Sequence, residues 1–150
     1  DYAKEAYLIF PIKNISSHLS ERESNPKYYF VDNGIISLLT LNAESALLEN
    51  TVAMELLRRY GQENQVFFYN EKVEVDFYIP ETTTAIQVCL YPHESDETWR
   101  RETEALIRFS KRLPFSQCLL ITMNDEETLT VDGVTIQLIP AWKWLIASPR

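Results

Sequence analysis

Four polar residues, Glu49, Asp76, Gln87 and Cys89, interrupt apolar stretches of the sequence in a way that could build one polar pocket. Glu49 lies in the middle of an apolar helical arc within residues 48–57, and a carboxylate aimed at a core needs a partner because removing a charge from water is costly. Asp76 alternates with apolar residues in one β-rich run, and Gln87 and Cys89 do so in the next. If these polar faces pair and the helix covers them, the four side chains converge.

Two further carboxylates are secondary candidates. Glu55 lies at the edge of the same helical arc, close to Arg59, where it could be a site residue or an ordinary rim charge. Glu74 shares a strand face with Asp76. Alternating polar residues usually decorate a solvated sheet face, and a core-facing glutamate such as Glu49 can be bonded to backbone amides or to an arginine. The residues alone leave both interpretations open.

The elements that position these residues follow from capping signals and periodicity. Ser45 is the expected N-cap of a helix that ends at Gly61, and Ser95 the expected N-cap of a second helix that reaches about residue 112 before Pro114. Strands are expected at residues 65–69, 73–79, 84–90, 118–123 and 134–139, with Asp132-Gly133 as a turn and a last helix starting at Pro140. In residues 73–79, simple alternation places Glu74, Asp76 and Tyr78 on one face.

The order from Ser45 onward predicts the α/β (α+β) class, with a mixed sheet flanked by helices. Before it, residues 2–7 are expected to form a short helical end, and strands at 8–12 and 28–31, joined by a long polar loop, a hairpin-like arm. A helix begins near Asn33. We therefore expect two parts, residues 1–42 and residues 43–150.

Composition narrows the class of protein. The chain has 150 residues, 45% of them hydrophobic, so it can bury a core without a metal or a disulfide framework. Its 14 Lys and Arg against 22 Asp and Glu give a net charge of −8, which disfavours nucleic acid as a partner.

No stretch is apolar enough for a membrane helix, and no glycine-rich phosphate loop is present. The two cysteines favour a reduced, cytoplasmic protein, and the start at Asp1 suggests a piece of a longer chain.

Other residue types have simpler interpretations. His18 and His93 lie in expected loops without a second ligand at metal-binding spacing, so both are expected to be exposed to solvent. Trp142 and Trp144 are expected to anchor the last helix. The cations at helix ends, which include Arg108, Lys111 and Arg112, are explained by compensation of the helix dipole.

Six segments together resemble a known family. They are residues 25–34 (NPKYYFVDNG), 48–50 (LEN), 55–59 (ELLRR), 73–77 (VEVDF), 86–89 (IQVC) and 139–145 (IPAWKWL). They are similar to the C-terminal domain of unknown function that follows the ATPase and winged-helix parts of many bacterial and archaeal AAA-type ATPases. The resemblance covers nearly the whole chain, and it implies a PD-(D/E)XK nuclease-like (restriction-endonuclease-like) core of order α-β-β-β-α-β at residues 43–150. Residues 1–42 then resemble the wing hairpin of a winged helix with its connecting helix.

The resemblance also implies roles for the four polar residues. In active members of the superfamily, a helix acid, a strand Asp and a strand Glu hold Mg²⁺, and a Lys two positions after that Glu assists the attacking water. By this resemblance Glu49, with Glu55 as second choice, and Asp76 stand at the first two positions, while Gln87 and Cys89 replace the Glu and the Lys. An amide removes one charge from a magnesium site, and a buried thiol supplies no cation beside a phosphate.

These departures lead to a functional expectation. We expect a non-catalytic accessory or interaction domain, the C-terminal part of an ATP-binding protein, with ATP bound in the absent upstream domain and no cofactor in these residues. Its expected partners are that ATPase domain and other proteins, with no membrane. The alternative is a nuclease acting on DNA or RNA with Mg²⁺ at Glu49, Asp76 and Gln87. A structural spacer is a third possibility.

Overall fold

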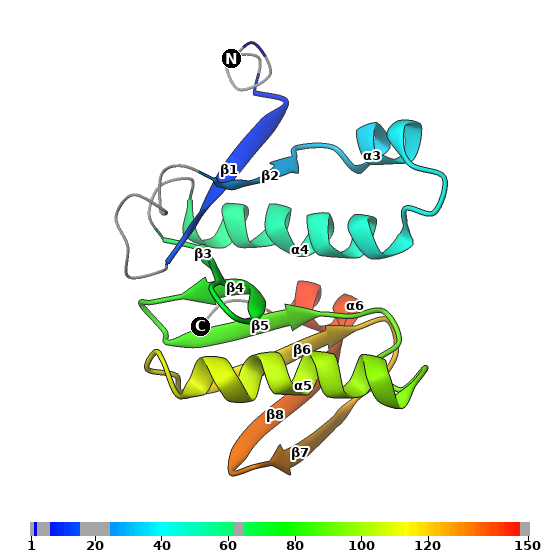
Figure 1. Cartoon of the computed structure of the whole chain (residues 1–150). Helices are drawn as coiled ribbons and strands as arrows, with labels where there is room; N and C mark the ends of the chain where they lie inside the picture. The colour runs from blue at the N-terminus through cyan, green and yellow to red at the C-terminus, as the bar shows by residue number, and fades with distance from the viewer. Residues whose placement is uncertain (1, 3–6, 16–24, 62–64, 148–150) are drawn as a thin grey trace.

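The computed structural model describes residues 2, 7–15, 25–61 and 65–147. Within these residues one mixed sheet of eight strands packs against four helices, which confirms the predicted α+β class (Figure 1). The strands are β1 (Ile9–Asn14), β2 (Lys27–Phe30), β3 (Phe67–Asn70), β4 (Glu74–Ile79), β5 (Thr84–Val88), β6 (Gln117–Thr122), β7 (Glu127–Val131) and β8 (Val134–Pro140). The helices are α3 (Asn33–Leu39), α4 (Glu44–Tyr60), α5 (Asp96–Ser110) and α6 (Ala141–Ile146).

The strand order in the sheet is β2-β1-β3-β4-β5-β6-β8-β7. Strands β3, β4 and β5 form the expected antiparallel meander, and β6 lies parallel to both β5 and β8. The predicted hairpin pairing of β1 with β2 is confirmed. Strand β1 also runs parallel to β3, so the arm extends the central sheet. The expected boundary between residues 42 and 43 falls between α3 and α4.

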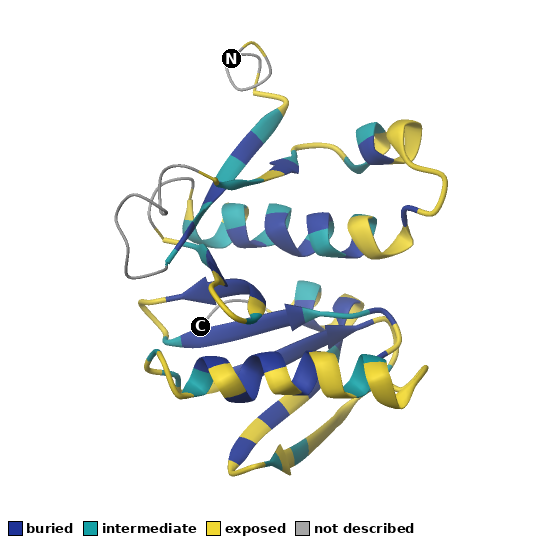
Figure 2. Cartoon of the chain, viewed as in Figure 1, coloured by how far each residue is buried: buried dark blue, intermediate teal, exposed yellow. Residues whose placement is uncertain are grey.

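The helices cover both faces of the sheet. Leu56 of α4 and Trp144 of α6 share one apolar cluster with Phe77, whereas Phe109 of α5 belongs to a second cluster with Tyr78. Strands β4, β5 and β6 lie between these layers and are almost continuously buried, as Figure 2 shows. The three central strands therefore form the rigid support for any site at their ends.

The helix ends agree with the sequence, with one correction. The Ser95 side chain accepts from Thr98 N and caps α5, and Gly61 ends α4 at φ 84°, a conformation that favours glycine. Ser45, however, is not the N-cap of α4. The helix begins at Glu44 after a buried Ala43, whose carbonyl accepts from Leu47 N at 2.7 Å. Ala43 occupies the N-cap position without a side-chain hydrogen bond.

A β-bulge corrects the predicted faces of β4. The pairing of β3 with β4 shifts from Phe67↔Tyr78 to Tyr69↔Val75, which leaves one extra residue on β4. After this point the alternation is inverted, so Tyr78 packs with Val75 beneath α5. The predicted common face of Glu74, Asp76 and Tyr78 is therefore wrong for Tyr78, because simple alternation cannot foresee an inserted residue.

Strand β7 was not predicted from the sequence. It forms one edge of the sheet and pairs with β8 through a turn at Asp132 (φ 49°) and Gly133 (φ 80°), so the expected turn is confirmed. Its residues 127–131 are exposed or half-buried, and this weakens the apolar alternation that identifies a strand.

Two expectations fall largely outside the described part of the chain: the short helix at residues 2–7 and the exposure of His18. Among the helices that the structure describes, none is long and apolar enough to cross a bilayer.

Candidate functional site

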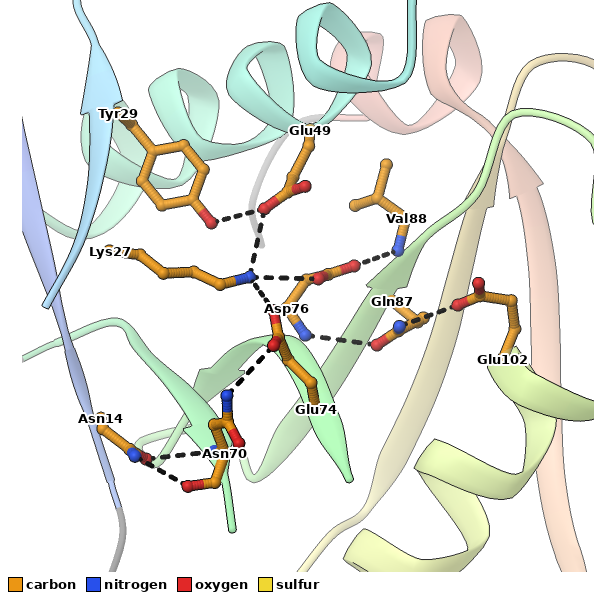
Figure 3. Close-up of polar contacts among 10 residues, drawn as sticks. All are labelled: Asn14, Lys27, Tyr29, Glu49, Asn70, Glu74, Asp76, Gln87, Val88 and Glu102. Atoms are coloured by element: carbon orange, nitrogen blue, oxygen red, sulfur yellow. Dashed lines mark hydrogen bonds and ion pairs between the residues drawn. The ribbon is translucent and has the colours of Figure 1, made fainter. Parts of the chain in front are cut away.

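A pocket of about 540 Å³ lies between α4 and α5, at the end of the sheet where β4 begins and β5 ends. Glu49, Asp76, Gln87 and Cys89 all line it, so the structure brings the four predicted residues together, and Glu74 lines it as well. Figure 3 shows most of this arrangement, with α4 on one side of the two strands and α5 on the other.

Glu55 has a different place. Its carboxylate accepts two hydrogen bonds from Arg58 and one from Arg59. The Arg58 bonds, followed by the Arg59 bond, lower the pKa of Glu55 to about 2 against the opposing effect of burial. Arg59 in turn donates to the Trp144 carbonyl and lies over the Trp144 ring at 4.3 Å. Glu55 therefore orients an arginine that joins α4 to α6, and it does not line the pocket.

Glu49, Glu74 and Asp76 form an acidic cluster in this pocket. The ammonium group of a lysine on β2, in the β1–β2 hairpin arm, lies at its centre. Lys27 Nζ lies 3.4 Å from Glu49 Oε1 and 3.5 Å from Asp76 Oδ1, and it also contacts Glu74 Oε1 (Figure 3). Burial alone would lower the pKa of Lys27, but the attraction of the carboxylates outweighs it and raises the pKa to about 12. Lys27 is thus a fixed cation that bridges α4, β2 and β4.

Glu49 has a second partner on the same arm. The Tyr29 hydroxyl donates to Glu49 Oε1 at 2.7 Å, and the Tyr29 side chain is buried against Phe77. Burial and the nearby Glu49 raise the pKa of Tyr29 well above its usual value, so the hydroxyl remains a proton donor. The Glu49 carboxylate, predicted to need a partner, has two.

Asp76 is the most deeply buried carboxylate of the cluster. Its Oδ2 accepts from Val88 N at 2.9 Å. Burial, reinforced by the negative charge of Glu49, raises the pKa of Asp76 to about 7, although Lys27 and the Val88 amide act in the opposite direction. Asp76 consequently titrates near neutral pH.

Gln87 is held by groups on both sides. Its Oε1 accepts from Asp76 N at 3.2 Å, and its Nε2 donates to Glu102 Oε2 at 2.8 Å. Glu102 is only 4% exposed and accepts two hydrogen bonds from Arg101. The Gln87 amide therefore serves a buried network that connects β4, β5 and α5.

Cys89 follows β5 and is half-buried at the pocket wall. Burial, followed by the nearby Glu102 carboxylate, raises the pKa of the Cys89 thiol to about 11. The thiol is therefore neutral at physiological pH and supplies neither a cation nor a thiolate ligand.

These residues do not fit a magnesium ion. Mg²⁺ needs anionic oxygens in octahedral geometry, whereas the cluster already holds the Lys27 ammonium and the Gln87 oxygen already accepts a backbone hydrogen bond. Within the described residues, no group of three or more His, Cys, Asp and Glu side chains is arranged to hold a metal. The donor set is therefore that of an internal ion-pair network.

Sequence reasoning missed three members of this region, namely Lys27, Glu102 and Asn50. Glu102 could have been found, because it lies three residues after Trp99 in the apolar stripe of α5. Nothing in the spacing of Lys27 connects it with Glu49, since the contact depends on how the β2 arm folds back on α4.

Asn50 joins the arm to α4 beside the pocket. It is 2% exposed, its Oδ1 accepts from Phe30 N at 2.8 Å, and its Nδ2 donates to Phe30 O and Asn33 Oδ1. We predict that Asn50→Ala lowers the free energy of unfolding by about 2–4 kcal/mol, because it leaves partly buried backbone groups of β2 and the Asn33 side chain without their partner. Urea unfolding followed by tryptophan fluorescence measures this loss. The exposed Asn42→Ala is the matched control, and equal stability of the two variants would contradict the prediction.

His93 and the two tryptophans of α6 do not line the pocket. His93 is exposed as predicted, and it pairs with Glu127 and stacks on Trp99. Trp144 is buried as an anchor, but Trp142 is 59% exposed, so the anchoring role predicted for Trp142 is wrong. Of the residues of the short helix α6, Ala141 and Trp144 are the buried ones.

The chain was also compared with known proteins. It is similar to an uncharacterized protein of Methanocaldococcus jannaschii, with 37% identity over 155 aligned residues that include 96% of this chain. The chain spans about a third (34%) of the length of that protein. No protein-family model matches the chain, and no solved structure does.

Proposed function

We propose that this chain is a non-catalytic accessory domain with a nuclease-like core, carried at the C-terminus of an AAA-type ATP-binding protein. The order α4-β3-β4-β5-α5-β6 supports the nuclease-like part, because it repeats the order that the sequence resemblance implies. The greater length of the archaeal relative is compatible with an ATP-binding region elsewhere in the longer protein. In this proposal the ATPase domain and further proteins are the partners, and ATP hydrolysis belongs to residues outside this chain.

One observation supports the proposed absence of catalysis. The Lys27 ammonium contacts three carboxylates at the place where a metal-dependent nuclease would need a divalent cation. A metal ion would have to displace the Lys27 ammonium from these carboxylates. The network therefore serves to fasten β2 to α4 and β4.

We further propose a cytoplasmic location. Cys89 and Cys118 are unpaired in the structure, and burial raises the pKa of each thiol to about 11. Unreactive, reduced thiols are typical of proteins from reducing compartments.

Calorimetric titration with Mg²⁺ and Mn²⁺, combined with cleavage assays on DNA and RNA, tests the proposal. We predict no saturable binding heat and no metal-dependent cleavage by the native chain. Cleavage that requires metal and is lost in Asp76→Asn would establish the nuclease alternative instead. Glu81→Gln, an exposed carboxylate in the β4–β5 turn, is the control variant, and circular dichroism verifies that both variants remain folded.

A further inference from the structure

A second hollow of about 280 Å³ adjoins the acidic pocket, with Lys72 and Val73 shared between their walls. It lies between the β3–β4 turn and the C-terminal end of α5. Most of the residues that line it are lysines and arginines: the lining consists of Tyr69, Lys72, Val73, Arg108, Lys111 and Arg112. The chain as a whole is acidic, with a net charge of −8, so a cluster of lysines and arginines differs from the rest of its surface.

Most of these cations lack an anionic partner. In residues 2, 7–15, 25–61 and 65–147, Lys72, Lys111 and Arg112 take part in no ion pair. Arg108 pairs with Glu104 at 3.2 Å, but both side chains are more than half exposed, so this pair offsets little. Two further anions lie near: Glu71 accepts from the Tyr69 hydroxyl at 3.2 Å, and Glu74 lines the adjoining acidic pocket together with Lys72.

The dipole of α5 accounts for part of this arrangement. Arg108, Lys111 and Arg112 lie at its C-terminal end, where positive charge is favoured. Lys72 belongs to the turn between β3 and β4, so the dipole does not explain why this lysine lines the same hollow. Like charges around one hollow repel each other, and an anion placed among them removes that repulsion.

We propose that this hollow binds the phosphate group of a ligand. Arginine guanidinium groups match phosphate oxygens with paired donors, and lysine supplies a mobile point charge. No aromatic ring in the lining is free to stack on a base, because Tyr69 is 4% exposed and packs edge-on against Phe109. Recognition therefore involves the phosphate itself, whether it belongs to a free nucleotide or to a nucleic-acid backbone. The acidic residues line the first pocket and not this hollow, so the inference does not rest on the proposed lack of catalysis.

Fluorescence anisotropy and calorimetry with three probes test the inference: inorganic phosphate, ATP without metal, and a labelled single-stranded oligonucleotide of about 20 nucleotides. Binding of the oligonucleotide alone identifies the phosphodiester backbone as the source, and binding of phosphate and ATP identifies a small ligand. For the oligonucleotide we expect the logarithm of the association constant to fall with the logarithm of salt concentration, with a slope of roughly −0.7 per phosphate contacted.

Variants locate the site. The double substitution Lys111→Ala with Arg112→Ala removes charges that line the second hollow but not the first, and we expect it to weaken binding at least about tenfold. Arg100→Ala, an exposed cation of α5 that lines neither pocket, should leave binding unchanged, and Glu71→Gln should strengthen it. Absence of binding by all three probes, equal binding of polyglutamate, or equal losses in Arg100→Ala and the double variant would overturn the assignment.

Discussion

Lys27→Met is expected to destabilise the fold by about 2–3 kcal/mol at neutral pH. The substitution keeps an unbranched side chain of similar length but leaves Glu49, Glu74 and Asp76 close together without their shared cation. Removing one partner from a buried ion pair typically costs about 3–5 kcal/mol, and the lower value reflects the 26% exposure of the Lys27 side chain. The loss should be larger at about pH 8 than at about pH 5, because protonation of Asp76 relieves the uncompensated charge.

Urea unfolding at both pH values measures this effect as a lower midpoint with an unchanged slope. Lys143→Met is the matched control, since Lys143 pairs with Glu126 on the surface and its loss should cost less than about 1 kcal/mol. Lys27→Arg, which retains the charge, should retain more of the stability than Lys27→Met. If Lys27→Met is as stable as the control variant, the ammonium is not what holds the arm to α4.

The second large effect concerns the dependence of stability on pH. The pKa of Asp76 is raised from the usual aspartate value of 3.8, which we take for the unfolded chain, to about 7 in the folded protein. Between these values the folded state holds a proton that the unfolded state has lost, so this residue's contribution to stability is present below about pH 4 and is lost as the pH rises to about 7. The shift corresponds to at most about 4 kcal/mol.

Asp76→Asn isolates this contribution from that of other groups. The variant cannot ionise but can still accept from Val88 N, so its stability relative to the native chain should rise steadily from about pH 4 to about pH 7 and then level off. The measurement is the difference in unfolding free energy between the two proteins at several pH values. Glu81→Gln, which is exposed in a turn, should give a flat difference. A flat difference for Asp76→Asn would show that Asp76 remains ionised in the folded state across this range.

The sequence predicted correctly those features that depend on a few neighbouring residues. Ser95 and Gly61 predicted helix ends because the cap and the positive φ are properties of a few neighbouring residues. The interruption of an apolar arc identified Glu49, and the same logic applied to α5 would have identified Glu102. Alternation failed for Tyr78, because a bulge depends on how β4 pairs with β3.

The sequence by itself determined the α+β class, the order of the central elements and the presence of Glu49, Asp76, Gln87 and Cys89 on elements able to meet. Only the tertiary structure determined which group lies between these side chains. The Lys27 ammonium reaches Glu49 across 22 positions of sequence, after the β2 arm has joined the sheet beside α4. The pattern of apolar and polar residues predicts which side chains become buried, because the tendency to be buried is a property of each residue type. It does not record which charges then pair, because that depends on distances that exist only once the sheet is assembled.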